Sequence, residues 1–227
     1  LNNAATRTRE FLKQADVVFI TLGTAFVYYL KDASATTGNG DAHGRAVANC
    51  HRQAPALFER RMITVEEAAR ALENIVQDLH RLNPKSHIVF TVSPLRHMGD
   101  GAHNNTLSKA TLQLAINKAL EEANATYFPS YEIVMDELRD YRFYADDMIH
   151  LSQTAEEYIF ERMTETYCSE KTRADIAQVE KLMRMANHRI ADPESPATRA
   201  FAGKILAQAK SLEKSISGLD LSEEIAK

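Results

Sequence analysis

The sequence predicts an α/β domain with a parallel sheet, followed by a purely helical segment. Two runs rich in β-branched and aromatic residues, Val17–Leu22 and His87–Val92, are typical of buried parallel strands, and Tyr127–Met135 indicates a third. Helix-like stretches alternate with these runs, which favours a parallel sheet. After Cys168 only helical periodicity remains. We therefore expect an α/β domain over residues 1–167 and a helical extension over 168–227 that packs on it.

The elements of the first half follow in order. Residues 6–14 predict a helix before the first strand, and the glycine-rich stretch Lys31–Arg45 predicts a long loop after it. Thr64 and Glu67 form a capping-box pattern, in which each side chain satisfies an amide of the other's turn. The apolar period beyond them predicts a helix as far as Leu82, where Asn83 and Pro84 end it.

The second half continues the alternation. The loop Leu95–Thr106 leaves the second strand and leads into an amphipathic helix, and Thr154 with Glu157 predicts the cap of a helix that ends near Tyr167. A polar and aromatic stretch, Asp136–His150, precedes that helix. Two further apolar stripes predict a helical hairpin; they comprise Ile176, Val179, Leu182, Met183 and Ala186, and then Phe201, Ile205, Ala209, Leu212 and Ile216.

Composition excludes several classes of function. A net charge of −4 gives no basic field for a nucleic acid or an anionic membrane. The longest apolar run is too short to cross a bilayer. Cys50 and Cys168 lie far apart, so we expect no disulfide, no metal, no cofactor and a cytoplasmic location.

Candidate site residues gather where the strands are predicted to end, because ligands of open parallel sheets bind outside the carboxyl ends of the strands. Gly23 closes the first strand, Ser93 closes the second, and Asp147 and His150 end the last long loop. The spacing of Asp147 and His150 lets a carboxylate reach Nδ1 of the imidazole. Nε2 could then take a proton from a nucleophile. By spacing alone, a capping aspartate beside a surface histidine is the alternative.

Four stretches resemble the GSCFA family, a branch of the SGNH hydrolases: ITLGTAFVY (20–28), VANCH (47–51), FTVSPLRH (90–97) and YFPSYEIVMDELRDYRFYADDMIH (127–150). The resemblance spans about residues 11–163. It implies a flavodoxin-like three-layer α/β/α fold, a serine nucleophile, backbone and asparagine donors for an oxyanion, and an Asp-x-x-His pair that matches Asp147 and His150.

This sequence departs from the family pattern at two places. The Gly-Ser-Cys-Phe-Ala string that carries the expected nucleophile is absent, so we expect an N-terminally truncated chain that is inactive by itself. The Gly-x-Asn-Asp of the wider superfamily reads Gly23, Thr24, Ala25, Phe26. We therefore assign the oxyanion donors to the Gly23 N–H and to Asn49, which could instead simply pin its own loop.

Other residues near the strand ends have competing roles. Ser93 lacks the sharp Gly-x-Ser-x-Gly turn between strand and helix that carries many catalytic serines, and Pro94 follows it. We therefore expect Ser93, Arg96 and His97 to face substrate or to stabilise the loop. Cys50 and His51 alone make a poor metal site. In the run 139–144, aromatic residues favour sugar binding, whereas Arg139 and Arg142 could lock the loop by pairing with Asp136, Asp140 or Asp146.

The leading hypothesis is a serine esterase or acyltransferase-like domain that acts on a small-molecule or carbohydrate acyl ester. A non-catalytic binding or scaffold domain is the alternative, and a metal hydrolase using His97, Asp147 and His150 is a third hypothesis. Loss of N-terminal strands would leave Val17–Leu22 at a sheet edge. We expect that edge to be covered by another segment or to promote homo-oligomers.

Overall fold

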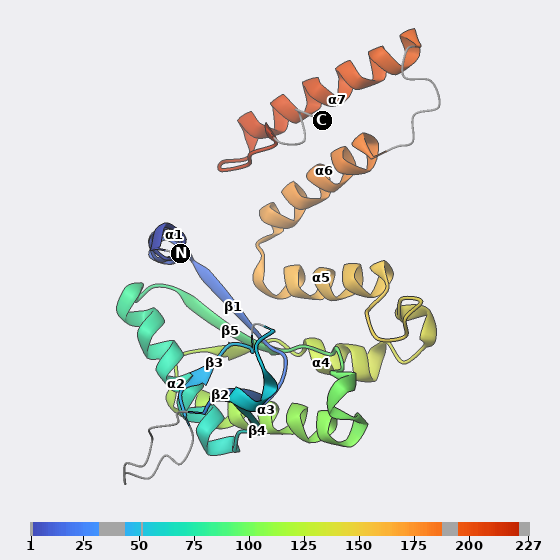
Figure 1. Cartoon of the computed structure of the whole chain (residues 1–227). Helices are drawn as coiled ribbons and strands as arrows, with labels where there is room; N and C mark the ends of the chain where they lie inside the picture. Colours follow the sequence, from blue (N-terminus) through green and yellow to red (C-terminus); the bar gives the residue numbers. More distant parts are fainter. Residues whose placement is uncertain (1, 32–43, 51, 188–194, 223–227) are drawn as a thin grey trace. The chain divides into compact units, whose positions relative to one another are not determined.

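The computed structural model describes residues 2–31, 44–50, 52–187 and 195–222 (Figure 1). Contacts divide the chain into two compact units, Leu1–Ile159 and Phe160–Lys227. Each unit is described by itself. None of the described helices combines the length and the apolar character needed to cross a membrane.

A three-stranded sheet forms the centre of the first unit and confirms the α/β prediction. Its order is β1 (Val17–Leu22), β5 (His87–Val92) and β6 (Thr126–Tyr127), and both pairings are parallel. β1 and β5 run side by side along their whole length, from Val17 opposite His87 to Leu22 opposite Val92 (Figure 1). Gly23 and Ser93 therefore lie next to each other's strands, each directly after the carboxyl end of its own strand.

Helices flank these strands at the predicted places. They are α1 (Asn2–Leu12), α2 (Val65–Leu82) and α3 (Ala102–Glu122), the last of which begins within the predicted loop 95–106. The capping box is confirmed: Thr64 Oγ1 accepts from Glu67 N at 3.1 Å, and Glu67 Oε2 accepts from Thr64 N at 2.8 Å. One core joins the sheet to α2 and α3; its buried members include Leu72, Val76, Ile88, Phe90, Val92, Leu112, Ile116 and Ala119.

The third predicted strand, Tyr127–Met135, is wrong beyond its first residue. β6 covers Thr126–Tyr127, and the chain then turns into α4 (Ser130–Glu132) and the π-helical turn η3 (Ile133–Glu137). Pro129 has no N–H for a strand ladder. Ser130 Oγ instead donates to Val92 O at 2.9 Å and lies 2.5 Å from Thr91 Oγ1, so a side chain takes over the contact with β5.

A second, antiparallel sheet lies outside the sequence prediction. It comprises β3 (Ala46–Val47), β2 (Phe26–Leu30) and β4 (Phe58–Met62), in that order, with the short 3-10 helix η1 (Pro55–Leu57) before β4. The guanidinium of Arg60 stacks 4.4 Å from the Phe26 ring centre, and that of Arg61 lies 4.8 Å from the Tyr29 ring centre. Arginines of β4 thus cover aromatic side chains on both faces of β2. Most of the loop predicted over Lys31–Arg45 lies outside the described residues.

β1 forms one edge of the parallel sheet, and β5 is its partner among the described strands. Val17 and Phe19 are each 40% exposed on this strand. The expectation of an edge strand is therefore met within the described residues. Whether this edge promotes homo-oligomers stays a prediction.

The helices after the α/β region follow the predicted stripes. α5 covers Gln153–Tyr167 and begins two residues earlier than a helix capped by Thr154 would. The predicted cap at Thr154 is wrong, because Ser152 caps the helix: Ser152 Oγ accepts from Ala155 N at 3.4 Å. In the second unit, α6 (Glu170–Ala186) and α7 (Pro196–Ser215) share a small apolar core of Leu182, Ala209, Leu212 and Leu221. Those two helices confirm the predicted hairpin.

Candidate active site

Asp147 and His150 form a hydrogen-bonded pair in the loop before α5. Asp147 Oδ2 lies 2.5 Å from His150 Nδ1. The other carboxylate oxygen, Oδ1, accepts from the main-chain N–H groups of Ile149 and His150, each at 2.9 Å. Three contacts therefore fix the carboxylate, although the side chains of His150 and Asp147 are 66% and 48% exposed.

A tight turn between these two residues brings them together. Met148 has φ 59°, in the left-handed region that non-glycine residues rarely adopt. Ala145 N donates to His150 O at 2.8 Å, and Met148 N donates to Ala145 O at 2.9 Å. Tyr144 and Leu151 form an antiparallel bridge at the base of the turn. The backbone thus holds the histidine over the aspartate despite the cost of the Met148 conformation.

The electrostatics of the pair favour an ionised carboxylate on Asp147. The hydrogen bond from His150, followed by the N–H bonds of Ile149 and His150, lowers the pKa of Asp147 to about 2. An ionised carboxylate accepts, so His150 carries its proton on Nδ1. Nε2 is then a lone-pair acceptor, and no described residue donates a hydrogen bond to it. This is the arrangement that a general base requires.

Gly23 directly follows β1 and carries a main-chain N–H at that strand end. Ser93 N donates to Leu22 O at 2.9 Å, which continues the ladder between β1 and β5 by one step. Because main-chain groups of successive strand residues point to opposite sides, the Gly23 N–H faces away from β5. It donates to no acceptor among the described residues. A Cβ at Gly23 would lie 3.6 Å from Nε2 of His97, so the His97 ring lies against this strand end.

Two adjoining hollows open beside these residues. One, of about 500 Å³, is lined by Tyr28, Arg60, His97, Gly99 and Asp100 together with Arg96, Met98 and Ile149. The other, of about 280 Å³, shares those last three residues and adds Pro94, Arg139, Tyr141, Tyr144 and Met148. Ile149 directly precedes His150. The loop after β5 and the loop of the pair therefore share one surface, which we call the rim hollow.

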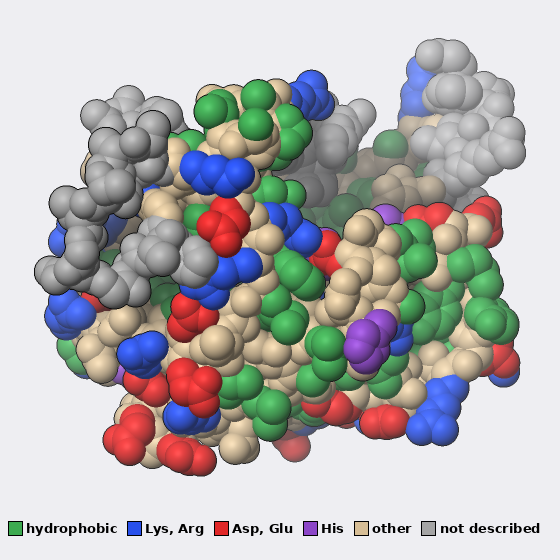
Figure 2. Space-filling model, turned by 60° about the horizontal axis from the view of Figure 1, so that its bottom comes forward, with side chains coloured by type: hydrophobic (Ala, Val, Ile, Leu, Met, Phe, Trp, Pro, Cys, Tyr) green, Lys and Arg blue, Asp and Glu red, His purple; other side chains and the backbone are tan. Residues whose placement is uncertain are grey.

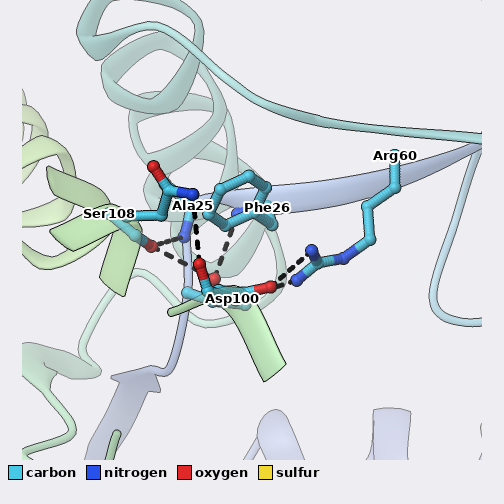
Figure 3. Close-up of polar contacts among 7 residues, drawn as sticks. Ala25, Phe26, Arg60, Asp100 and Ser108 are labelled. Atoms are coloured by element: carbon cyan, nitrogen blue, oxygen red, sulfur yellow. Dashed lines mark hydrogen bonds and ion pairs between the residues drawn. The ribbon is translucent and has the colours of Figure 1, made fainter. Parts of the chain in front are cut away.

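The arginines around the rim hollow differ in how their charge is balanced. Arg60 reaches from β4 to Asp100 with bonds of 2.5 and 3.0 Å (Figure 3). Arg139 pairs with Asp136 at 3.0 Å and Arg142 with Asp140 at 3.1 Å, as the loop-locking interpretation predicts. Arg96 pairs with no carboxylate in the described part of the chain. It is the guanidinium that both halves of the rim hollow share.

The remaining predicted residues do not all join this cluster. Ser93 Oγ accepts from Leu95 N at 3.3 Å, so this hydroxyl contributes to the turn after β5. Asn49 lines another hollow, of about 430 Å³, with Arg45, Val47 and Phe58. That hollow contains no other predicted site residue. Cys50 is a free thiol, and His51 lies outside the described residues.

Buried polar residues of α3, which the sequence prediction missed, support the strand ends. Ser108 Oγ accepts from Ala25 N at 2.7 Å and lies 3.1 Å from Thr24 Oγ1 (Figure 3). Lys109 Nζ donates to Gly23 O and to Ser93 O, each at 2.6 Å. Ser108 and Lys109 lie one helical turn before Leu112, on the same inner face as Leu112 and Ile116. The helical periodicity of that face could therefore have identified them as buried.

No group of three or more metal-ligating side chains is arranged to hold a metal ion within the described ranges. Charged side chains of both signs are interspersed on the face drawn in Figure 2, with no single-sign field there. The described residues thus offer an acid–base pair, a main-chain donor and a hollow with one arginine that lacks a carboxylate partner. The lining of the hollow includes Ile149, next to His150, and His97, whose ring lies against Gly23.

Comparison with known proteins places these features in a family context. Residues 1–163 match the model of the GSCFA family. Residues 179–227 match the model described as GSCFA domain protein, C-terminal domain. No curated protein and no solved structure matches the chain significantly.

Proposed function

The chain belongs to the GSCFA family, and on this premise we propose that it is an SGNH-type serine ester hydrolase or acyltransferase-like domain. The observation that carries the proposal is the 2.5 Å contact between Asp147 Oδ2 and His150 Nδ1, which leaves Nε2 open at the surface. The serine nucleophile would come from sequence N-terminal to Leu1, as the resemblance to the family implies.

His150 and Asp147 have distinct roles in the proposed reaction. Nε2 of His150 takes the proton of the serine hydroxyl while its oxygen bonds to the ester carbonyl carbon. The carbonyl oxygen becomes an oxyanion, and the imidazolium is stabilised by the Asp147 carboxylate. His150 then returns the proton to the departing alcohol oxygen as the C–O bond breaks. A water or an acceptor alcohol attacks the acyl-enzyme by the same steps in reverse.

The Gly23 N–H is the proposed oxyanion donor of this chain, because it ends a strand at the rim and lacks an acceptor among the described residues. A donor aimed at developing charge contributes roughly 10²- to 10³-fold to kcat. Asn49 remains a proposed second donor. Its hollow is separate from the rim hollow, so it would need a loop position different from the one described.

The rim hollow supports a small-molecule or carbohydrate acyl ester as substrate. Tyr141 and Tyr144 contribute aromatic surface, and Tyr141 is 77% exposed. Aromatic faces beside polar groups suit sugar rings. Arg96 and His97 line the same hollow and are the proposed substrate contacts.

Fluorophosphonate labelling of the protein expressed from its complete reading frame tests the proposal. We expect labelling of a serine, and its loss in His150→Ala. The matched control is His80→Ala: His80 Nε2 contacts Ser86 O at 3.2 Å, just before β5, at the opposite end of that strand from the rim. Labelling that persists in His150→Ala contradicts the proposed role of the pair.

A non-catalytic binding domain is the second candidate. The observation that favours it is that no described hydroxyl contacts His150 Nε2. In that case the rim hollow would hold a ligand without turnover. Absence of labelling in the protein from the complete reading frame supports this candidate and contradicts the esterase proposal.

A further inference from the structure

Lys109 is a buried cationic side chain that the proposed reaction leaves unused. It lies on the inner face of α3 and is 2% exposed. A buried lysine is costly unless its charge is satisfied. Among the described residues, however, it forms no ion pair with a carboxylate. Its partners are main-chain carbonyls.

These carbonyls belong to the two strand ends that border the rim hollow. Lys109 Nζ donates to Gly23 O, after β1, and to Ser93 O, after β5, each at 2.6 Å. One side chain thus bridges two loops that are far apart in sequence. Hydrogen bonds with a charged donor are roughly twice as strong as neutral ones.

The neighbouring side chain extends this contact. Ser108 Oγ accepts from Ala25 N at 2.7 Å, so consecutive residues of α3 hold the segment 23–25 by a carbonyl and an amide. This segment has no helix or strand of its own to fix it. The bond from Ser93 N to Leu22 O fixes the Leu22–Gly23 peptide and so the direction of the Gly23 N–H, and Ile63 N binds Ala25 O at 2.9 Å. Lys109 fixes the next peptide, Gly23–Thr24, and so the path of the chain after Gly23.

We infer that Lys109 is a positioning residue of this site: by binding Gly23 O and Ser93 O it holds Gly23 in place beside the end of β5 and fixes the start of the loop that carries Arg96 and His97. The inference rests on the proposed function, because the place of the Gly23 N–H matters for catalysis only if it meets an oxyanion. The tether itself can be tested without catalysis.

The electrostatic surroundings make the tether observable. Burial, and next the positive charge of Arg96, lower the pKa of Lys109 to about 8. The other titratable group at these strand ends is His97, whose ring lies against Gly23. A neutral amine has two N–H groups, which match the two carbonyls, whereas the third proton of the ammonium meets no acceptor among the described residues.

Carbonyl carbon NMR on the 227-residue chain tests the tether directly. We expect the Gly23 and Ser93 carbonyl resonances to titrate with one midpoint near pH 8, shared with Cε of Lys109. His97→Gln should leave this midpoint unchanged. Carbonyl resonances that do not follow Cε of Lys109 overturn the inference, and this measurement needs no variant of Lys109 that folds.

Kinetics of the protein from its complete reading frame test the positioning role. We expect Lys109→Met to lower kcat by roughly ten- to a hundredfold, as for a displaced catalytic group, with KM changed less than about threefold. The control is Lys118→Met, on the same helix, whose side chain is 50% exposed. An unchanged kcat in folded Lys109→Met overturns the inference. If the wild-type protein hydrolyses no ester, the proposed function fails, and the carbonyl titration still decides whether the tether exists.

Discussion

Replacing Asp147 by Asn is the sharpest test of the acid–base pair, because it removes one charge and keeps the shape. The carbonyl oxygen of an Asn can still accept from the Ile149 and His150 N–H groups, both now at 2.9 Å from Oδ1. The amide nitrogen then takes the place of Oδ2, 2.5 Å from Nδ1. It is a donor, so His150 must present a lone pair there and carry its proton on Nε2.

A histidine with Nε2 protonated cannot accept the proton of a nucleophile. In a serine protease triad the same change of tautomer lowers kcat by about 10⁴-fold, and we expect a loss of that order here. The assay is ester hydrolysis by the protein from its complete reading frame, with nitrogen NMR of the His150 ring in the 227-residue chain as the structural readout. A variant with kcat within tenfold of wild type, or with its proton still on Nδ1, would refute this reasoning.

The pH dependence of the pair follows from the pKa of Asp147, about 2. Because the carboxyl pKa is lower in the folded loop than in the unfolded chain, the ionised carboxylate stabilises the fold. This stabilisation is complete at pH values above the unfolded pKa, near 4. That contribution is lost as the pH falls through 2. We expect the Asp147–His150 contact to persist at pH 5 and to weaken below pH 3, as followed by the amide resonances of Ile149 and His150. Loss of the contact already at pH 5 would show that these hydrogen bonds do not lower the pKa of Asp147.

Three further predictions concern stability. Met148→Gly should keep the pair intact and leave the free energy of unfolding unchanged or raised, because glycine relieves a left-handed conformation that costs about 1–2 kcal/mol. Met148→Val should lower the free energy of unfolding. Urea denaturation of the two variants distinguishes these outcomes. Arg61 and the Thr64 N–H lower the pKa of Glu67 to about 2, so the stabilisation by Glu67 should be complete above pH 4.5 and disappear toward pH 2, and Glu67→Gln should abolish this dependence. Asn105→Leu should raise the free energy of unfolding by about 1–3 kcal/mol, since both amide atoms are buried without a partner among the described residues; a decrease would show that the amide binds a buried water.

Local sequence patterns correctly predicted the elements that a few neighbouring residues determine. His87–Val92 forms a strand with the predicted bounds, and Thr64 with Glu67 makes the predicted cap, because strand propensity and capping are decided within a few residues. The predicted strand Tyr127–Met135 was wrong because the side chain of Ser130, in place of a main-chain N–H, donates the hydrogen bond to Val92 O. The antiparallel sheet was missed because β2 pairs with β4 about thirty residues further along the chain, and strands so far apart in sequence are not marked by a short turn motif.

The site shows the same division. The spacing of Asp147 and His150 predicted their contact, but not the left-handed Met148 that makes it possible. Lys109 could have been found as a polar residue on an apolar helix face. Its partners could not, because Gly23 O and Ser93 O are main-chain groups, which carry no signature in the sequence.

Bonds between side chains and the main chain hold the loops of this candidate site. Asp147 binds two N–H groups of its own turn, and Lys109 binds the carbonyls of two strand ends. Apolar packing would allow such loops to slide, whereas each hydrogen bond fixes a direction as well as a distance. A site that must aim an imidazole and an N–H at one reacting group needs fixed directions. Ser108 and Lys109, on the inner face of α3, are therefore as much a part of the proposed machinery as the exposed pair of Asp147 and His150.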